Sequence, residues 1–151
     1  MRPMSSPAEM TPRERNDAML ARIRSGPPQP YQDGGYVLRV LTVPGRRTGQ
    51  PRSWPIGVVQ WHGHHYLCAP HRRRDWVRNL LAAGECTLEG DQPSRYDATL
   101  IETPEAAEVV ASYLHAMGRP STMWPFPSDA PAEQIRPHLP EIAIFQLTAA
   151  P

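Results

Sequence analysis

The stretch Tyr36-Val37-Leu38-Arg39-Val40-Leu41-Thr42-Val43 is a mostly apolar run in which β-branched side chains recur. Residues of this kind favour extended structure, and Pro44-Gly45 ends the run with a turn signal. A loop over residues 46–51 follows, and the next apolar stretch predicts a second strand over residues 53–61. The turn His62-Gly63-His64 then returns the chain into a third strand over residues 65–69.

Helices and further strands are predicted on either side of this first group of strands. Thr11-Pro12-Arg13-Glu14 has the residues of a helix start, with Thr as N-cap and Glu three positions later, and Gly26 ends that helix. Thr103-Pro104-Glu105 predicts another helix with the same cap chemistry, as far as Met117. The remaining predicted elements are a helix over residues 74–83 and strands over residues 85–89, 96–102 and 142–147.

Five or six short antiparallel strands with a helix inserted among them predict one small closed β-barrel over residues 11–151. Residues 1–10 are rich in Pro and Ser, so we expect a disordered tail there. Residues 118–140 contain six prolines, which predicts a long ordered loop or lid without regular structure.

Composition limits the possible partners. All 16 basic residues are Arg, yet the net charge is only +1, so we expect no nucleic-acid partner. No apolar run approaches the ~20 residues of a membrane span, so we expect a soluble, cytoplasmic protein without a membrane partner. Cys68 and Cys86 lie in apolar surroundings and are expected to be buried free thiols, because two isolated cysteines form neither a disulfide framework nor a metal cluster.

The loop Gly45-Arg46-Arg47-Thr48-Gly49-Gln50-Pro51-Arg52 carries the densest chemical signal. Arg46, Arg47 and Arg52 could converge from a tight turn on one polyanion, and the loop could also expose free N–H groups. The alternative is a solvated hairpin loop that happens to be basic.

The second signal is Ala69-Pro70-His71-Arg72-Arg73-Arg74-Asp75-Trp76-Val77-Arg78-Asn79-Leu80, where a strand end turns into a helix start. Trp76 and Asn79 lie one helical turn apart on the same face. Trp76 could equally be a core anchor, and the arginines a solvent-exposed face. The histidines of residues 62–65 sit at a turn without Cys or carboxylate ligands nearby, so we expect no metal site. Hydrolase, kinase and Rossmann motifs are not found in the sequence.

Together, in this order and spacing, the two motifs resemble the deazaflavin-dependent nitroreductase family. Its pattern runs G-R-[KR]-[ST]-G-x-x-R, a hairpin strand, and W-x-x-N-L on a helix. The resemblance covers roughly residues 36–90. It implies a flavin-reductase-like split β-barrel of about six antiparallel strands that binds coenzyme F-420 and reduces nitro compounds, quinones or activated alkenes.

The resemblance also implies residue roles. The phosphate and polyglutamate tail would be held by Arg46, Arg47, Thr48, Gly49 and Arg52. The ring system would lie against Ala69, Pro70 and His71 and be closed off by Trp76 and Asn79. Many family members have small or acidic residues where this chain has His71-Arg72-Arg73-Arg74, and this departure could strengthen coenzyme binding, change the substrate class or block the groove.

The expected substrate is a planar conjugated carbonyl, quinone or nitro compound. Its predicted contacts are Tyr113, Met123, Trp124 and Phe126, and Tyr113 or His71 is the predicted proton donor that balances hydride delivery. Tyr113 could equally be a core aromatic of an amphipathic helix. The main alternative is a non-redox ligand-binding or cyclase-type protein on the same scaffold, and FMN is a less favoured coenzyme. Split barrels often form dimers, and the sequence leaves a homodimer open.

Overall fold

The computed structural model describes residues 9–151, so the tail predicted over residues 1–10 lies outside the described residues except for its last two. The six strands are β1 (Tyr36–Pro44), β2 (Pro51–Trp61), β3 (His64–Ala69), β4 (Glu85–Glu89), β5 (Arg95–Leu100) and β6 (Ala143–Ala149). The helices are α1 (Pro12–Arg24), α2 (Asp75–Ala83), α3 (Pro104–Met117) and α4 (Ala132–Ile135), followed by a 3-10 turn over Arg136–His138.

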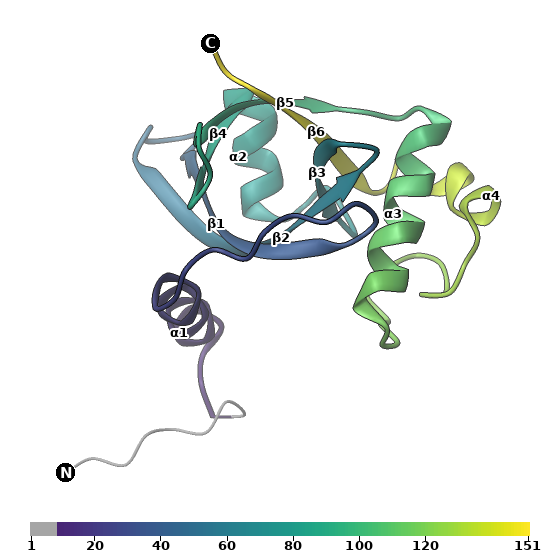
Figure 1. The fold of residues 1–151 in the computed structure, drawn as a ribbon, viewed down its shortest axis with the longest axis horizontal. Coiled ribbons are helices and arrows are strands. Elements are labelled where there is room, and N and C mark those ends of the chain that lie inside the picture. The colour runs from purple at the N-terminus through teal and green to yellow at the C-terminus, as the bar shows by residue number, and fades with distance from the viewer. Residues whose placement is uncertain (1–8) are drawn as a thin grey trace.

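The strands close into an antiparallel barrel in the order β1-β2-β3-β6-β5-β4 (Figure 1). The long hairpin of β1 and β2 pairs Tyr36 with Val59 and Pro44 with Pro51. Pairing of β1 with β4 closes the ring, with Leu41 opposite Leu88. The predicted barrel is therefore confirmed, and every predicted strand exists with its ends shifted by at most two residues.

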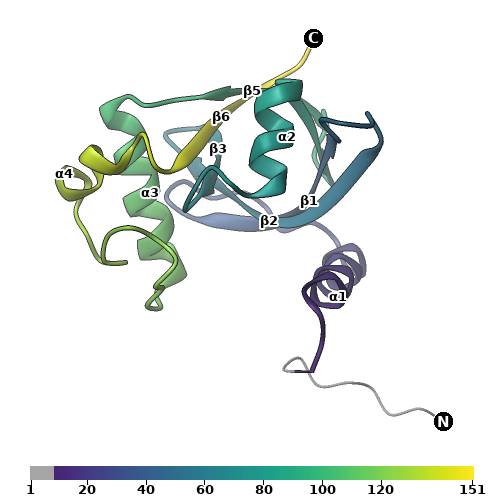
Figure 2. The same cartoon turned by 180° about the vertical axis from the view of Figure 1, so that it is seen from behind.

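The barrel core is filled by alternate residues of the strands and by α2. Leu41 and Val58 are fully buried on the inner face, as is Leu67. Helix α2, which faces the viewer in Figure 2, inserts Val77 and Leu80 into the same cluster. Gly84, in the left-handed region at φ 70°, ends this helix so that the chain can turn directly into β4.

One inward position of β1 carries a charge. Arg39 is 3% exposed, and its Nε donates to Asp91 Oδ1 over 2.9 Å. The hydroxyls of Tyr31 and Tyr96 both donate to Asp91 Oδ2 at 2.7 Å, and the Arg39 guanidinium lies over the Tyr31 ring. Burial and the adjacent Asp91 carboxylate raise the pKa of both phenols. The ion pair is thus held in a hydrogen-bonded network, which offsets the cost of burying its charges.

The two predicted helix starts differ in their caps. The Thr11 hydroxyl accepts from the Glu14 amide at 3.1 Å and donates to the Glu14 carboxylate, forming the predicted capping box of α1. Thr103 occupies the corresponding position of α3 but makes no side-chain cap bond, so the expectation of equal cap chemistry was wrong there. Burial of Val110 and Leu114 holds α3 against the outside of the barrel instead.

Residues 118–140 are more regular than predicted, because α4 and the 3-10 turn lie within them. After Pro131 at the cap position comes Ala-Glu-Gln-Ile, a sequence compatible with one helical turn. Phe126 and Trp124 are 5% and 9% exposed. They pack with Ile135 and the buried face of α3 in an apolar cluster that is separate from the barrel core. Met123 is 59% exposed. Two of the three predicted substrate contacts in this segment therefore belong to the packing between α3 and the barrel.

Candidate functional site

The arginine loop between β1 and β2 is held by its own hydrogen bonds. The Gly45 amide donates to the Gln50 carbonyl, and the Gly49 amide donates to the Gly45 carbonyl, both over 2.8 Å. Gly49 has φ 75°, a conformation that glycine adopts without strain. The Thr48 hydroxyl accepts from the Gln50 amide at 3.2 Å. Because these amides are already engaged, the positive potential of the loop comes mainly from its guanidinium groups, with less from a nest of free N–H groups than expected.

Asn79 fixes the orientation of this loop from the neighbouring helix α2. Its side chain is buried, and its Oδ1 accepts from the Arg46 amide at 3.1 Å and from Arg46 Nη1 at 2.8 Å. Arg46 Nη2 also lies 3.5 Å from the Asp75 carboxylate. The two sequence motifs are therefore joined in space by one amide side chain.

A small pocket of about 170 Å³ lies at this junction. It contains three guanidinium groups and a single carboxylate, that of Asp75. Its lining residues are Gly45, Arg46, Arg47, Thr48, Arg52, Asp75 and Asn79. The structure thus brings five predicted coenzyme residues to one cavity, whose volume suits a phosphate or carboxylate group but not a whole dinucleotide-sized molecule.

The three consecutive arginines before α2 point to different surroundings. Arg72 donates from Nε to the Ile142 carbonyl at 2.7 Å, donates to the Leu139 carbonyl and pairs with Glu102, so it ties this loop to the start of β6. Arg73 is exposed. Arg74 is half-buried, and its Nη2 contacts the Met123 sulfur at 3.8 Å. The run is neither one solvated face nor one anion cluster.

The residues predicted to contact the ring system are mostly packed into the protein. Ala69 and Pro70 are buried, and Trp76 is tilted against Phe145 with ring centroids 6.1 Å apart. Their side chains therefore serve the core, as the core-anchor alternative for Trp76 required. A role for this segment in contacting a coenzyme ring stays a prediction.

His71, one of the two predicted proton donors, is partly exposed in the loop before α2. Its Nδ1 accepts a hydrogen bond from the Arg73 amide at 3.2 Å, which leaves the other ring nitrogen, Nε2, as the N–H of the neutral ring. Partial burial, followed by the charges of Arg73 and Arg74, lowers its pKa. At neutral pH His71 is therefore held mainly in the uncharged form.

Tyr113, the other predicted proton donor, lies on α3. Its ring packs edge-on against that of Tyr36, with 5.3 Å between the ring centroids. Both rings lie over Gly57 of β2. A Cβ atom at position 57 would come within 3.1 Å of Tyr36 Cδ2 and 3.3 Å of the Tyr113 hydroxyl oxygen. Burial raises the pKa of Tyr113 to about 12, although the positive charges of Arg74 and Arg119 act in the opposite direction. The phenol is therefore protonated at neutral pH.

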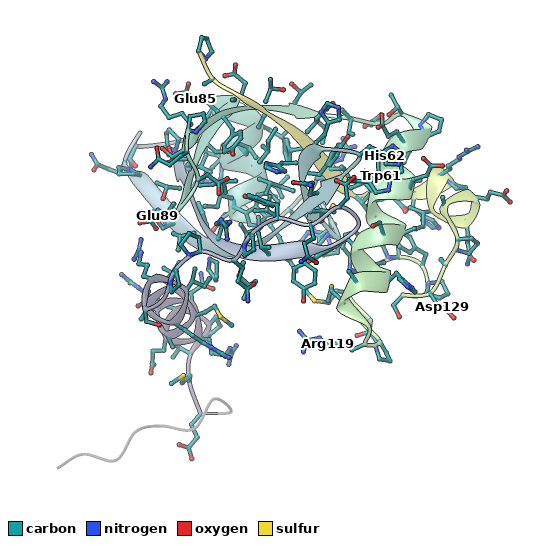
Figure 3. All side chains as sticks on the ribbon, in the orientation of Figure 1. Trp61, His62, Glu85, Glu89, Arg119 and Asp129 are labelled. Atoms are coloured by element: carbon teal, nitrogen blue, oxygen red, sulfur yellow. The ribbon has the colours of Figure 1, made fainter. Side chains whose placement is uncertain are left out.

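Two larger cavities lie away from these residues. One of about 390 Å³ separates α1 from β1, and one of about 710 Å³ lies between the end of α3 and the segment that follows it. Arg119 and Asp129, which both line the second cavity, are labelled in Figure 3. Neither contains a residue predicted to act in coenzyme or substrate binding. The arginine pocket is smaller, but its donor groups have the chemistry that an anionic coenzyme requires.

The closed antiparallel barrel with outer helices is consistent with the split β-barrel class that the resemblance implies. A family model described as F420H2-dependent quinone reductase matches residues 14–120, and so the chain belongs to the F420H2-dependent quinone reductase family. The protein is accordingly an oxidoreductase that uses coenzyme F-420 and acts on quinones. A comparison with curated proteins found no match. None of the helices in the described part of the chain has the length and hydropathy that a membrane span requires.

Proposed function

We propose that the arginine pocket is where this quinone reductase holds the anionic part of F-420. The observation that carries the proposal is the convergence of Arg46, Arg47 and Arg52 on one cavity. F-420 contains a phosphodiester and several carboxylates, which are the groups that guanidinium forks bind most strongly. The donor set therefore fits the coenzyme, since a single carboxylate opposes three cations and that carboxylate is within 3.5 Å of Arg46.

Residues 69–71 would hold the ring system of the coenzyme, as the family resemblance implies. Reduced F-420 supplies hydride when bound. The protein's residues would orient the quinone, exclude water and donate a proton. Tyr113 is the proposed donor at neutral pH, and His71 could take that role only at a lower pH, where its ring is protonated. Met123, Trp124 and Phe126 would lie beside the substrate. Because Trp124 and Phe126 are buried, Met123 offers most of the accessible surface in this group. Nitro compounds and enones, which are also planar and conjugated, are further proposed substrates.

Two further parts of the proposal concern the cellular location and the oligomeric state of the enzyme. A cytoplasmic location is favoured by Cys68 and Cys86, which are both free and buried. A homodimer is proposed from the frequency of dimers among split barrels, and light scattering at micromolar protein concentration would measure it.

The coenzyme site is tested by an Arg46→Ala, Arg47→Ala double variant. F-420 binding, measured by fluorescence titration, should weaken by about 2–5 kcal/mol, the sum of two charge-assisted contacts at a partly exposed site. Arg13→Ala, Arg22→Ala on α1 is the matched control, since it removes two exposed arginines far from the loop and should bind F-420 like the parent protein. Unchanged F-420 affinity in the loop variant would place the anionic part of the coenzyme elsewhere.

A further inference from the structure

The side chain of Arg72 bonds to two segments that are distant from it in the sequence. Its Nε donates to the Ile142 carbonyl at 2.7 Å, and its Nη2 donates to the Leu139 carbonyl at 3.0 Å. Nη2 also pairs with the carboxylate of Glu102, which lies between β5 and α3. Because a guanidinium is a rigid planar fork, these three acceptors fix where the segments that supply them lie relative to the loop before α2.

The carbonyls that Arg72 binds lie where a short helical turn ends. Leu139 is the C-cap residue of the 3-10 turn Arg136–His138, and the last carbonyls of a helical turn have no partner within it. A cation at such an end satisfies these carbonyls and meets their partial negative charge. The Arg72 side chain is 29% exposed, so its bonds are partly shielded from solvent. The contact therefore fastens the end of a turn to the loop before α2.

The two segments that Arg72 joins contain residues from the two sides of the proposed reaction. Residues 69–71, which would hold the coenzyme ring, directly precede it, and the segment between α3 and β6 contains Met123, which would contact the quinone. Figure 2 shows the chain before α2 beside the start of β6. A second contact spans the same gap, since Arg74 Nη2 lies 3.8 Å from the Met123 sulfur. Hydride transfer requires reacting atoms about 3–3.5 Å apart, so the separation of these segments affects its rate.

We propose that Arg72 is a positioning residue, which holds residues 69–71 and the segment between α3 and β6 at the separation that hydride transfer requires. The inference rests on the proposed function, because it takes these two segments to be the coenzyme side and the quinone side of the site. Arg72 acts through the segments that it joins, since its Nε and Nη2 are bonded to protein acceptors. At position 72 the departure from the family pattern thus serves geometry and not anion binding.

The first test follows amide hydrogen exchange in the protein without coenzyme. The amides of Glu141 and Ile142 both donate to the His138 carbonyl, and in Arg72→Gln they should exchange about ten times faster than in the parent protein, because the turn loses its bonds to the guanidinium. Arg73→Gln is the matched control, since it removes an exposed guanidinium from the next position and should leave these rates unchanged. Equal rates in Arg72→Gln and the parent protein would overturn the proposal.

The second test measures hydride transfer in a single turnover, from F420H2 to menadione as a soluble quinone, with both at saturation. Arg72→Gln should transfer hydride about ten- to a hundredfold more slowly, the loss expected when reacting groups are misplaced by about 1 Å. Its Kd for F-420 should stay within about threefold of the parent value. Arg72→Lys keeps the charge beside Glu102 but loses the fork, so it should be slower than the parent protein by only about three- to tenfold. Arg73→Gln should match the parent protein.

Two kinetic outcomes would also overturn the proposal. One is a parent-like rate of hydride transfer in folded Arg72→Gln, which would make the contact purely structural. The other is a loss of F-420 affinity as large as the loss of rate, which would make Arg72 a coenzyme residue. Thermal unfolding establishes that each variant is folded, and Arg72→Lys decides the question if Arg72→Gln is not. Failure of the parent protein to bind F-420 or to reduce menadione would instead contradict the proposed function, so the two failures are distinguishable.

Discussion

Asn79 shows how one side chain can hold the arginine loop in place. Its buried Oδ1 accepts hydrogen bonds from the backbone amide and from Nη1 of Arg46. The Asn79 side chain therefore joins helix α2 to the loop between β1 and β2. The sequence pattern indicated Asn79 as a coenzyme contact. Its observed contacts show a different first role, which is to position an arginine that lines the pocket.

Two variants of Asn79 separate loop order from pocket charge. Asn79→Ala leaves the Arg46 amide without its acceptor and should lower the free energy of unfolding by about 1–3 kcal/mol and weaken F-420 binding. Asn79→Asp keeps the acceptor and should retain stability within about 1 kcal/mol, yet it should also weaken F-420 binding because it adds a negative charge to an anion site. Urea unfolding and fluorescence titration measure the two effects. Parent-like F-420 affinity in both variants would contradict the placement of the coenzyme.

At the scale of elements, the segment between α3 and β6 has buried and exposed apolar side chains that its sequence did not distinguish. Trp124 and Phe126 stack at 5.7 Å between centroids and are buried, whereas Met123 is exposed next to Arg74. The prolines stiffen the segment, and the short helix α4 anchors it through Ile135. Adjacent residues thus differ in burial, and only Met123 is accessible for the proposed contact with substrate.

This division predicts opposite effects for neighbouring substitutions. Trp124→Ala should lower the free energy of unfolding by about 3–5 kcal/mol, the usual cost of removing a buried aromatic side chain. Met123→Ala should change stability by less than about 0.5 kcal/mol, because it is a surface substitution. It should nevertheless raise KM for quinone several-fold without changing F-420 affinity. A Met123→Ala enzyme with unchanged KM would remove this residue from the substrate site.

At the scale of the whole molecule, the buried thiols and phenols make the free energy of unfolding depend on pH in the alkaline range. Burial raises the pKa of the Cys68 thiol from its ordinary 9.0 and that of Cys86 to about 12. Burial and Asp91 likewise raise the phenol pKa values of Tyr31 and Tyr96 from 10.0. The unfolded chain therefore releases these protons at lower pH than the folded protein, and the folded state binds more protons in that range.

The consequence is a loss of stability as pH rises above about 8, where the unfolded thiols begin to ionise. The free energy of unfolding, measured in urea at successive pH values, should fall steadily from about pH 8 upwards. A Cys68→Ala, Cys86→Ala variant should keep its activity, and its stability should begin to fall only above about pH 9, where the unfolded phenols begin to ionise. Identical pH profiles for the two proteins would show that the thiols do not contribute.

The sequence by itself determined the elements of this protein and the order of its motifs. Strand runs, the capping box at Thr11 and the turn His62-Gly63 are local features, since the residues that cause them lie within a few positions of each other. The loop of residues 45–52 and the Trp76–Asn79 pair were equally visible, because their spacing along the chain is the signal. Local chemistry therefore sufficed for the barrel class, whereas the role of the loop in coenzyme binding stays a prediction.

Tertiary structure alone decided which of these residues meet. Closure of β1 on β4 pairs residues 45 to 49 positions apart, and the Arg39–Asp91 ion pair joins residues 52 positions apart. The different fates of Arg72, Arg73 and Arg74 could not be read from three identical side chains, because each is set by a distant partner. The same holds for Gly57, whose need for glycine comes from rings on β1 and α3. Contacts of this kind depend on how the barrel closes, which a local sequence pattern does not predict.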